Sequence, residues 1–296
     1  MSRPASDHRH RRPCGGASAP TPELLQWLRE QFRAGRRDDE ALQLMRASGW
    51  AQAVARAALD RARLDMSQAD HAAGPSPGRR VPGPQAADGS NRIEADGHAV
   101  QLLVTLRHPR LVVFGDFLTD AECDALIAEA RPRMARSETV DTATGGGEIN
   151  AARTSRGMFF ECGETPLVRR IERRIEALLH WPVDWGEPLQ VLHYEPGAEY
   201  RPHHDYFDPG QPGTAAVLGR GGQRVGTLLI YLAAPEAGGA TSFPEAGLEI
   251  AAVKGCAVFF GYERASADSL TLHGGEPVRR GDKWVATKWL REREFR

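Results

Sequence analysis

One short segment of the chain combines residue types that can bind a transition metal. His203 and Asp205 stand two positions apart in a run with the alternation of a β-strand, and this spacing places both side chains on one face. An imidazole and a carboxylate on one face supply two of the three ligands of a 2-His-1-carboxylate Fe(II) site. His204 points to the opposite face under the same alternation, so we expect His203 to be the ligand.

A third ligand and a buried cation are predicted near the C-terminal end of the chain. His273 ends an expected strand, and in a jelly roll strands far apart in sequence become neighbours. In the following segment, alternation puts Lys283 on the same face as Val285 and Thr287. A lysine on such an inward face needs an anionic partner, because a buried unpaired ammonium is costly. A ligand carboxylate can supply that anion.

The composition is that of a soluble globular protein without a strong charge bias. Of the 296 residues, 41% are hydrophobic and 26% are charged, and the formal net charge is −1. Such a chain has no overall field that favours nucleic acid or an acidic membrane as a partner. No apolar run has the length of a membrane span, and no secretory signal is visible. Four scattered cysteines favour a reducing compartment, the cytoplasm.

Changes in composition divide the chain into four segments. Residues 1–20 are polar and rich in Pro, Gly and Arg, which predicts a disordered tail. Apolar residues at helical spacing predict a small three-helix bundle over residues 21–66. Residues 67–96 are dense in Pro, Gly, Ala and Ser, which predicts a linker. The main domain is therefore expected to cover residues 97–296. The bundle is expected to pack on that domain, to bind a protein partner or to mediate dimerisation.

The main domain is predicted to be mainly β with flanking helices. Thr119 and Thr165 carry the signals of helix N-caps. From residue 189 onward, short alternating segments separated by Gly and Pro predict a series of strands, which is typical of a sandwich, barrel or jelly roll. The Gly-rich segment 137–152 has little to bury and is expected to be either a mobile lid or a passive surface loop.

Several motifs in a fixed order resemble the prolyl 4-hydroxylase family of Fe(II)- and 2-oxoglutarate-dependent dioxygenases. They lie between about residue 109 and residue 292 and include Gln190-Val-Leu-His-Tyr194, Tyr200-Arg-Pro-His203-His-Asp205, Gly238-Gly-Ala-Thr241-Ser-Phe-Pro244, and the run from His273 to Glu292. The resemblance implies a double-stranded β-helix catalytic domain, which agrees with the predicted strands. It also implies that His203, Asp205 and His273 bind Fe(II).

The resemblance assigns further roles around the metal ligands. It implies that Lys283 pairs with the distal carboxylate of 2-oxoglutarate, assisted by the hydroxyl of Tyr194. Thr227 is expected to add a hydrogen bond to the same cosubstrate, and Tyr200 and Arg153 to face a groove for a peptide substrate. The implied reaction consumes O2, decarboxylates 2-oxoglutarate to succinate and hydroxylates an unactivated C–H bond. In this family L-ascorbate commonly restores over-oxidised iron.

Alternative functions remain open on the sequence alone. The leading interpretation is a hydroxylase of peptidyl proline, and a hydroxylase of a free amino acid or small metabolite fits the same residues. A catalytically idle jelly roll that only binds is disfavoured, because all three ligand residues and Lys283 are present. A nucleic-acid demethylase of the same superfamily fits less well. Those enzymes typically hold the keto acid through arginine, and this chain has no basic stripe.

Overall fold

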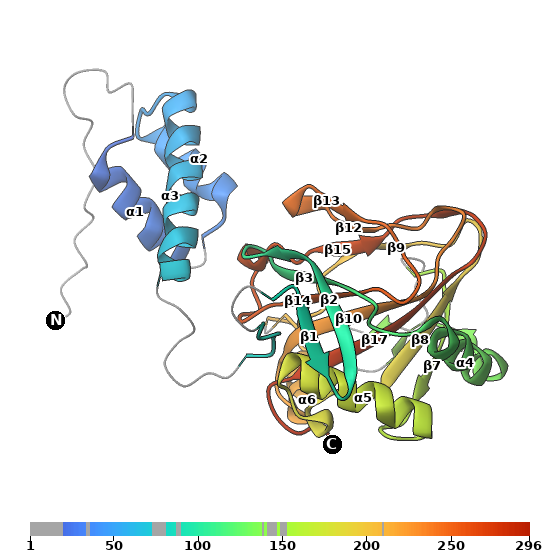
Figure 1. Ribbon diagram of the computed structural model, residues 1–296. Helices are drawn as coiled ribbons and strands as arrows, with labels where there is room; N and C mark the ends of the chain where they lie inside the picture. The colour runs from blue at the N-terminus through green and yellow to red at the C-terminus, as the bar shows by residue number, and fades with distance from the viewer. Residues whose placement is uncertain are drawn as a thin grey trace. The chain divides into compact units, whose positions relative to one another are not determined.

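The computed structural model of the chain describes residues 20–33, 36–72, 81–86, 90–137, 139–140, 147–148, 153–208 and 210–296. These residues belong to two compact units, Met1–Arg79 and Arg80–Arg296 (Figure 1). The predicted tail, except for its last residue, lies outside the described residues, and so does most of the predicted lid or loop at residues 137–152. None of the described helices is long and apolar enough to cross a membrane.

The first unit contains three helices around a small apolar core. They are α1 (Pro22–Arg33), α2 (Asp38–Ala47) and α3 (Gln52–Ala72). Side chains from all three form the core: Leu24, Leu28, Phe32, Ala41, Met45, Ala55, Ala58, Leu59 and Ala62. Helix α3 continues beyond residue 66, where the bundle was expected to end. The reason is local, because no Gly or Pro interrupts the sequence of α3.

The second unit is built on two antiparallel sheets. The major sheet has the strand order β1-β2-β3-β14-β10-β17-β8-β7-β4, and the minor sheet has the order β13-β12-β15-β9. Two short pairs, β5 with β6 and β11 with β16, accompany them. The bounds are β1 (Arg92–Ala95), β2 (His98–Leu106), β3 (Arg110–Gly115), β4 (Ala135–Arg136), β5 (Thr139–Val140), β6 (Gly147–Glu148), β7 (Arg156–Phe160), β8 (Leu189–Tyr194), β9 (Tyr200–His203), β10 (Arg224–Ala233), β11 (Ala237–Gly238), β12 (Thr241–Phe243), β13 (Leu248–Ile250), β14 (Ala257–Gly261), β15 (His273–Gly275), β16 (Val278–Arg280) and β17 (Lys283–Arg291).

The two sheets face each other across an apolar layer. Phe243 of the minor sheet packs in one cluster with Tyr231, Phe260 and Val285 of the major sheet. The rings of Phe243 and Phe260 meet edge to face, with their centroids 5.3 Å apart. This arrangement of two packed antiparallel sheets is a double-stranded β-helix, or jelly roll. The predicted mainly-β fold with flanking helices is therefore confirmed.

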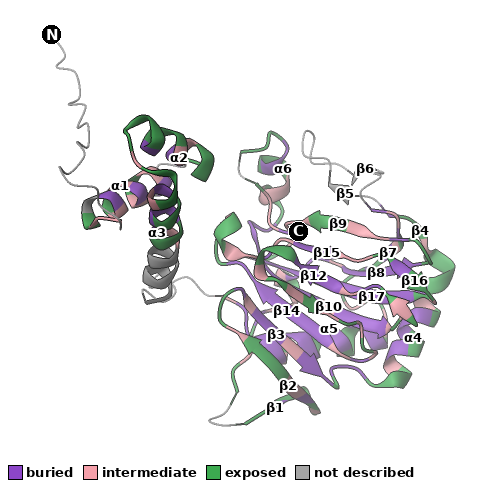
Figure 2. Ribbon diagram, turned by 90° about the horizontal axis from the view of Figure 1, so that it is seen from above, coloured by how far each residue is buried: buried purple, intermediate pink, exposed green. Residues whose placement is uncertain are grey.

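Two helices cover the other face of the major sheet. Leu126 of α4 (Asp120–Ala130) and Ile171 of α5 (Pro166–Leu179) pack in the same core as Leu228 and Ala286 of the sheet. Both helices begin with a threonine N-cap whose side chain accepts a backbone N–H, as predicted. A short helix, α6 (Thr214–Gly219), lies between β9 and β10. Figure 2 shows the resulting buried layer through the central strands.

A β-hairpin occupies the end of the predicted linker. Strand β1 pairs with β2 around a turn in which Asp96 and Gly97 have φ angles of 53° and 75°. Two positive φ angles in an Asp-Gly turn are the requirement of a type I′ hairpin. The side chains of Ile93 and Ala95 are buried, so these residues belong to the second unit. The expected start of the main domain at residue 97 is therefore too late.

Strand pairing brings the predicted site residues together from distant parts of the chain. His203 on β9 and His273 on β15 are register partners in the minor sheet. Tyr194 on β8 and Lys283 on β17 are register partners in the major sheet. His273 begins β15 rather than ending a strand, because Leu270 before it adopts a left-handed conformation that closes a 3-10 turn. The two pairs lie on facing sheets of one jelly roll.

Candidate active site

Three side chains converge between the two sheets in the geometry of a metal site. The ligand atoms of His203, Asp205 and His273 all lie within 4.8 Å of one another, and within the described residues this is the only such group. Nε2 of His203 is 3.6 Å from Oδ1 of Asp205, and Nε2 of His273 is 3.6 Å from Oδ2. The structure thus brings together the three residues that the sequence suggested as metal ligands.

Backbone carbonyls fix the orientation of both imidazoles. Nδ1 of His203 is 2.9 Å from the carbonyl oxygen of Arg201, and Nδ1 of His273 is 3.0 Å from that of Thr271. Because a carbonyl can only accept, each Nδ1 carries the proton and each Nε2 presents a lone pair. Burial lowers the pKa of His273 to about 4, which keeps its ring neutral at pH 7. This is the second contact that metal-binding histidines usually make.

The carboxylate of Asp205 is ionised although it is buried. Burial by itself acts to raise the pKa of Asp205, but the neighbouring His273, His203 and Arg224 outweigh it and hold the pKa below its usual range. Thr227 Oγ1 also donates a hydrogen bond to Oδ2 of Asp205, at 2.7 Å. Two imidazole nitrogens and one carboxylate are the donor set of a non-haem Fe(II) centre. The residues present therefore fit Fe(II).

A cavity extends from these three residues to Lys283. Its lining includes Arg153, Leu192, Tyr194, Tyr200, His203, Asp205, Thr227, Leu229, Thr241, Phe260, His273, Lys283, Val285, Thr287 and Trp289. The side chains of Val285 and Thr287 line it together with Lys283, as the alternation of β17 predicts. Apolar side chains of β8, β10 and β14, namely Leu192, Leu229 and Phe260, also line it.

Lys283 is a buried cation that lacks an anion at contact distance. Its exposed fraction is 3%, and no hydrogen bond or ion pair joins its Nζ to another described residue. Nζ lies 5.5 Å from the ring centroid of Tyr194 and 5.8 Å from that of Tyr231. Burial lowers the pKa of Lys283 to about 8, although Glu276 acts in the opposite direction. A ligand carboxylate would relieve this cost, so the cavity fits a dicarboxylate such as 2-oxoglutarate.

Two threonines that line the cavity have hydroxyl groups with different hydrogen-bond partners. Thr227 has one hydroxyl proton and donates it to Asp205, so it has no donor left for a cosubstrate carboxylate. Thr241 Oγ1 instead accepts the Tyr231 hydroxyl at 2.8 Å, which leaves its own proton to be donated into the cavity. The segment around Thr241 matches a motif of the family in the sequence, but no role was expected for Thr241 itself. The missing signal was the pairing of β12 with β15, which brings Thr241 opposite Gly275.

The two residues expected to face a substrate lie side by side at the same cavity. The ring of Tyr200 stacks on the ring of His203, with centroids 3.7 Å apart. An isolated β-bridge pairs Arg153 with Tyr200, and the guanidinium carbon of Arg153 is 4.9 Å from the centroid of the Tyr200 ring. Arg153 also donates to Oε1 of Gln190 at 2.9 Å. Both residues therefore border the metal ligands.

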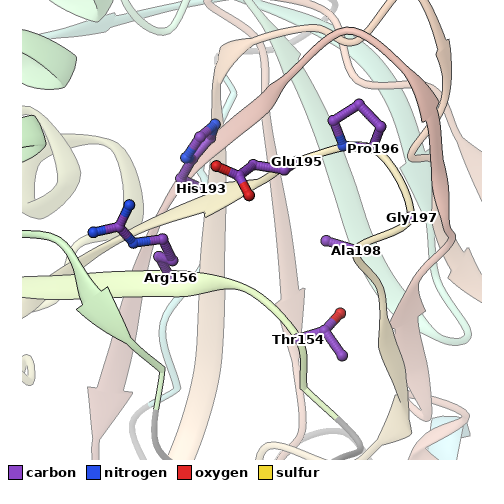
Figure 3. A pocket seen from close by; sticks show the side chains of 7 residues that line it. All are labelled: Thr154, Arg156, His193, Glu195, Pro196, Gly197 and Ala198. Atoms are coloured by element: carbon purple, nitrogen blue, oxygen red, sulfur yellow. The ribbon is translucent and has the colours of Figure 1, made fainter.

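Two other histidines lie away from this cavity. His204 is not a member of the convergent group, and its ring stacks on Tyr206 with centroids 4.6 Å apart. His193 is stacked on Trp284 at 4.2 Å. It lines a separate open pocket beside the turn after β8 (Figure 3), together with Thr154, Arg156, Glu195, Pro196, Gly197 and Ala198. None of the three candidate metal ligands lines that pocket.

Comparisons with known proteins assign the chain to a family. The family model described as the 2OG-Fe(II) oxygenase superfamily matches residues 189–291. Prolyl 4-hydroxylase 5 of Arabidopsis thaliana is 41% identical over 209 residues, which cover 64% of this chain and 70% of that protein. Prolyl 4-hydroxylase 1 of the same plant is 42% identical over 203 residues, with 62% and 70% covered. The chain belongs to the prolyl 4-hydroxylase family.

The family assignment agrees with the chemistry of the cavity. This prolyl 4-hydroxylase family member is a 2-oxoglutarate-dependent dioxygenase that uses Fe(II), as its motifs implied. Among solved structures, the viral collagen prolyl hydroxylase of Paramecium Bursaria Chlorella virus-1 in a 2OG complex is 29% identical. The match has a TM-score of 0.46 and covers 61% of this chain and 95% of that chain.

Proposed function

We propose that this enzyme hydroxylates a peptidyl proline, with Fe(II) bound by His203, Asp205 and His273. One observation carries the proposal: a single cavity is lined both by a three-residue group that can hold a metal and by a buried lysine without an anion at contact distance. The names of the relatives, prolyl 4-hydroxylases, supply the substrate class. Hydroxylation of a free amino acid or small metabolite is the alternative that the same cavity leaves open.

The residues around Lys283 are proposed to hold 2-oxoglutarate. Lys283 would pair with its distal carboxylate, and the hydroxyls of Tyr194 and Thr241 would donate hydrogen bonds to it. Leu229, Phe260 and other apolar residues of the lining would exclude water from the bound keto acid. Bound Fe(II), with 2-oxoglutarate and O2, supplies the oxidising power for hydroxylation of an unactivated C–H bond. The protein contributes orientation, charge and a dry cavity.

Tyr200 and Arg153 are proposed to orient the substrate. Burial raises the pKa of Tyr200 to about 12, against the influence of Arg153, so its hydroxyl stays protonated and can donate to a peptide carbonyl. The Tyr200 ring lies against His203, which places a flat apolar surface beside the metal group. Such a surface suits the ring of a proline side chain.

Mass spectrometry with a parallel succinate assay tests this function. Anaerobically prepared enzyme with Fe(II) and 2-oxoglutarate should add 16 Da to proline-containing peptides on exposure to air and release succinate in equal amount. Free proline in place of the peptide tests the metabolite alternative. Succinate without a product on any peptide would overturn the peptide proposal, and no succinate at all would leave only a binding role.

A pair of neighbouring histidines provides a matched test of the metal ligands. His203→Gln should abolish Fe(II) binding and succinate formation. His204→Gln changes the adjacent residue, which lies outside the convergent group, and should keep Fe(II) bound. If the two variants bind Fe(II) equally well, His203 is not a ligand.

We propose that L-ascorbate sustains multiple turnovers, which assays with and without it would show.

Cys123, Cys162 and Cys256 are free, which supports a reducing compartment such as the cytoplasm. The helical unit remains a candidate for binding a protein partner or for dimerisation. Light scattering on the full chain and on residues 80–296 would separate dimerisation from a partner-binding role.

A further inference from the structure

Asp205 is a buried carboxylate that lies just outside the strand carrying His203. Strand β9 ends at His203, so Asp205 lies beyond the hydrogen-bond ladder that fixes the backbone of its neighbour. It is nevertheless only 6% exposed. A carboxylate in this position needs other contacts to hold it. Besides the two histidines of the minor sheet, Thr227 and Arg224 of the major sheet form hydrogen bonds with Asp205.

A chain of two hydroxyl groups leads from the major sheet to the Asp205 carboxylate. Thr227 of β10 donates to Oδ2 of Asp205 at 2.7 Å, and the Tyr262 hydroxyl lies 2.8 Å from Oγ1 of Thr227. The direction of the second bond follows from counting protons. An ionised carboxylate can only accept a hydrogen bond, so Thr227 donates its single hydroxyl proton to Asp205. Tyr262 must therefore be the donor to Thr227. Both hydroxyl-bearing side chains are about 1% exposed.

The backbone of Asp205 is held from the same side. Nη1 of Arg224 donates to the carbonyl oxygen of Asp205 at 3.1 Å. Arg224 is itself fixed by Glu187, whose two carboxylate oxygens accept from it at 2.6 and 2.8 Å. The main chain of Asp205 is thus anchored independently of its side chain. The two hydroxyl groups remain to determine how the carboxylate is turned.

We propose that Thr227 and Tyr262 are positioning residues that orient the Asp205 carboxylate for metal binding through one oxygen. The inference rests on the proposed function, because it takes Asp205 as an iron ligand. The hydrogen bond from Thr227 occupies one acceptor site of Oδ2, which favours Oδ1 as the oxygen that would bind the metal. With three protein donor atoms, a six-coordinate ion keeps three positions for 2-oxoglutarate and O2. A carboxylate that binds through both oxygens would leave two.

Metal titration of four variants tests the proposal without relying on turnover. The probes are Fe(II) under anaerobic conditions and Co(II), whose visible absorption reports its coordination. Thr227→Val should weaken the binding of both ions about 10- to 100-fold, the range found when hydrogen bonds behind metal ligands are removed. Thr227→Ser keeps the hydroxyl and should restore most of the affinity. Tyr262→Phe should have a smaller effect, since Thr227 can still donate.

The double variant Thr227→Val/Tyr262→Phe distinguishes a relay from two separate contributions. Tyr262 acts on Asp205 only through Thr227, so the double variant should bind Co(II) no more weakly than Thr227→Val alone. The absorption spectrum of bound Co(II) should change in Thr227→Val and stay as in the wild type in Ser155→Ala. Ser155 is a matched control, because its buried hydroxyl bonds to that of Ser137 at 3.0 Å and does not contact the metal group.

Three results would overturn the proposal. The first is binding of both ions by Thr227→Val within about twofold of the wild type. The second is an equal loss of affinity in Thr227→Ser and Thr227→Val. The third is a double variant in which the losses from Thr227 and Tyr262 add. Failure of the proposed function looks different, because the wild-type chain itself would then fail to bind Fe(II) or to form hydroxyproline.

Discussion

At the scale of single residues, Lys283 shows how the active site costs stability. Its ammonium is buried beside Tyr194 and Tyr231 with no anion in contact. The charge of Lys283 therefore lowers the stability of the free protein and becomes favourable only when a ligand supplies an anion. The sequence indicated this through alternation on β17 and the cost of an unpaired buried charge, so this part of the cavity was predictable from local pattern.

Replacement of Lys283 by methionine should stabilise the protein while removing cosubstrate binding. Burial lowers the pKa of Lys283 from 10.5 to about 8, which corresponds to a destabilisation of about 3 kcal/mol at neutral pH. Lys283→Met should recover a similar amount in denaturant unfolding without ligand. It should also abolish 2-oxoglutarate binding and leave Fe(II) binding intact. A variant that is less stable than the wild type would show that Lys283 has an anionic partner already.

The affinity for 2-oxoglutarate should fall as the pH rises through about 8. Below this pKa, Lys283 is protonated and attracts the distal carboxylate, and above it the free enzyme has lost that charge. Binding near pH 8 should therefore take up a proton. Without ligand the sign for stability is the reverse, since the unfolded chain keeps this proton up to a pKa of about 10.5 and stability rises with pH between the two values. Calorimetry in buffers of different ionisation enthalpy would measure the proton uptake.

At the scale of secondary-structure elements, β17 serves two faces of the fold. Lys283, Val285 and Thr287 line the cavity, and Trp284, Ala286 and Leu290 pack toward α4 and α5. Lys288 also points away from the cavity and toward α5, where its Nζ forms a buried ion pair with Oε1 of Glu172 at 2.6 Å. Helix α5 and strand β17, which also carries Lys283, are thus joined by an ion pair inside the core.

Loss of one partner of this ion pair should be far more harmful than loss of both. Lys288→Met leaves Glu172 buried without its cation and should lower the free energy of unfolding by about 3–5 kcal/mol. The double variant Lys288→Met/Glu172→Gln should recover most of that loss, because the amide oxygen can still accept the N–H of Gly163. Chemical denaturation of the three variants measures the difference. Equal losses in the single and the double variant would contradict this account.

The sequence could predict contacts within an element better than contacts between elements. The spacing of His203 and Asp205 and the alternation after Lys283 are local signals. Both residues of the first pair converge as predicted, although β9 ends at His203 and Asp205 lies beyond it. The proposed role of Thr241 could not be predicted in the same way, because Thr241 reaches the cavity through the pairing of β12 with the distant strand β15. The β1–β2 hairpin was missed for another reason. Its Asp-Gly turn stands in a segment whose overall composition resembles a linker.

At the scale of the whole molecule, the second unit begins before its first strand. Pro82 and Gly83 are buried, and the N–H of Gly83 donates to the carbonyl of Leu179 at 2.9 Å. Part of the predicted linker therefore belongs to the catalytic unit. A truncation that removes Pro82 and Gly83 should therefore destabilise the second unit.

Two truncations should behave differently. Residues 80–296 should fold and decarboxylate 2-oxoglutarate within about twofold of the full chain, because the cavity lies within that unit. Residues 90–296 lack Pro82 and Gly83 and should have a lower melting temperature by several degrees. Differential scanning fluorimetry and a succinate assay compare them. If residues 80–296 are inactive though folded, the helical unit contributes directly to catalysis.

The position of the three proposed metal ligands means that a bound iron ion would connect two unequal sheets. His203 and His273 belong to the minor sheet, whose strands are only three or four residues long, while Asp205 is tied to the major sheet through Thr227. Removal of the ion should allow the minor sheet to open locally while the major sheet stays folded. Hydrogen exchange should then accelerate in β9, β12, β13 and β15 after chelation and change little in β10 and β17. Bound iron would hold the minor sheet against the major sheet. Removal of the iron should therefore loosen the minor sheet before the fold as a whole is lost.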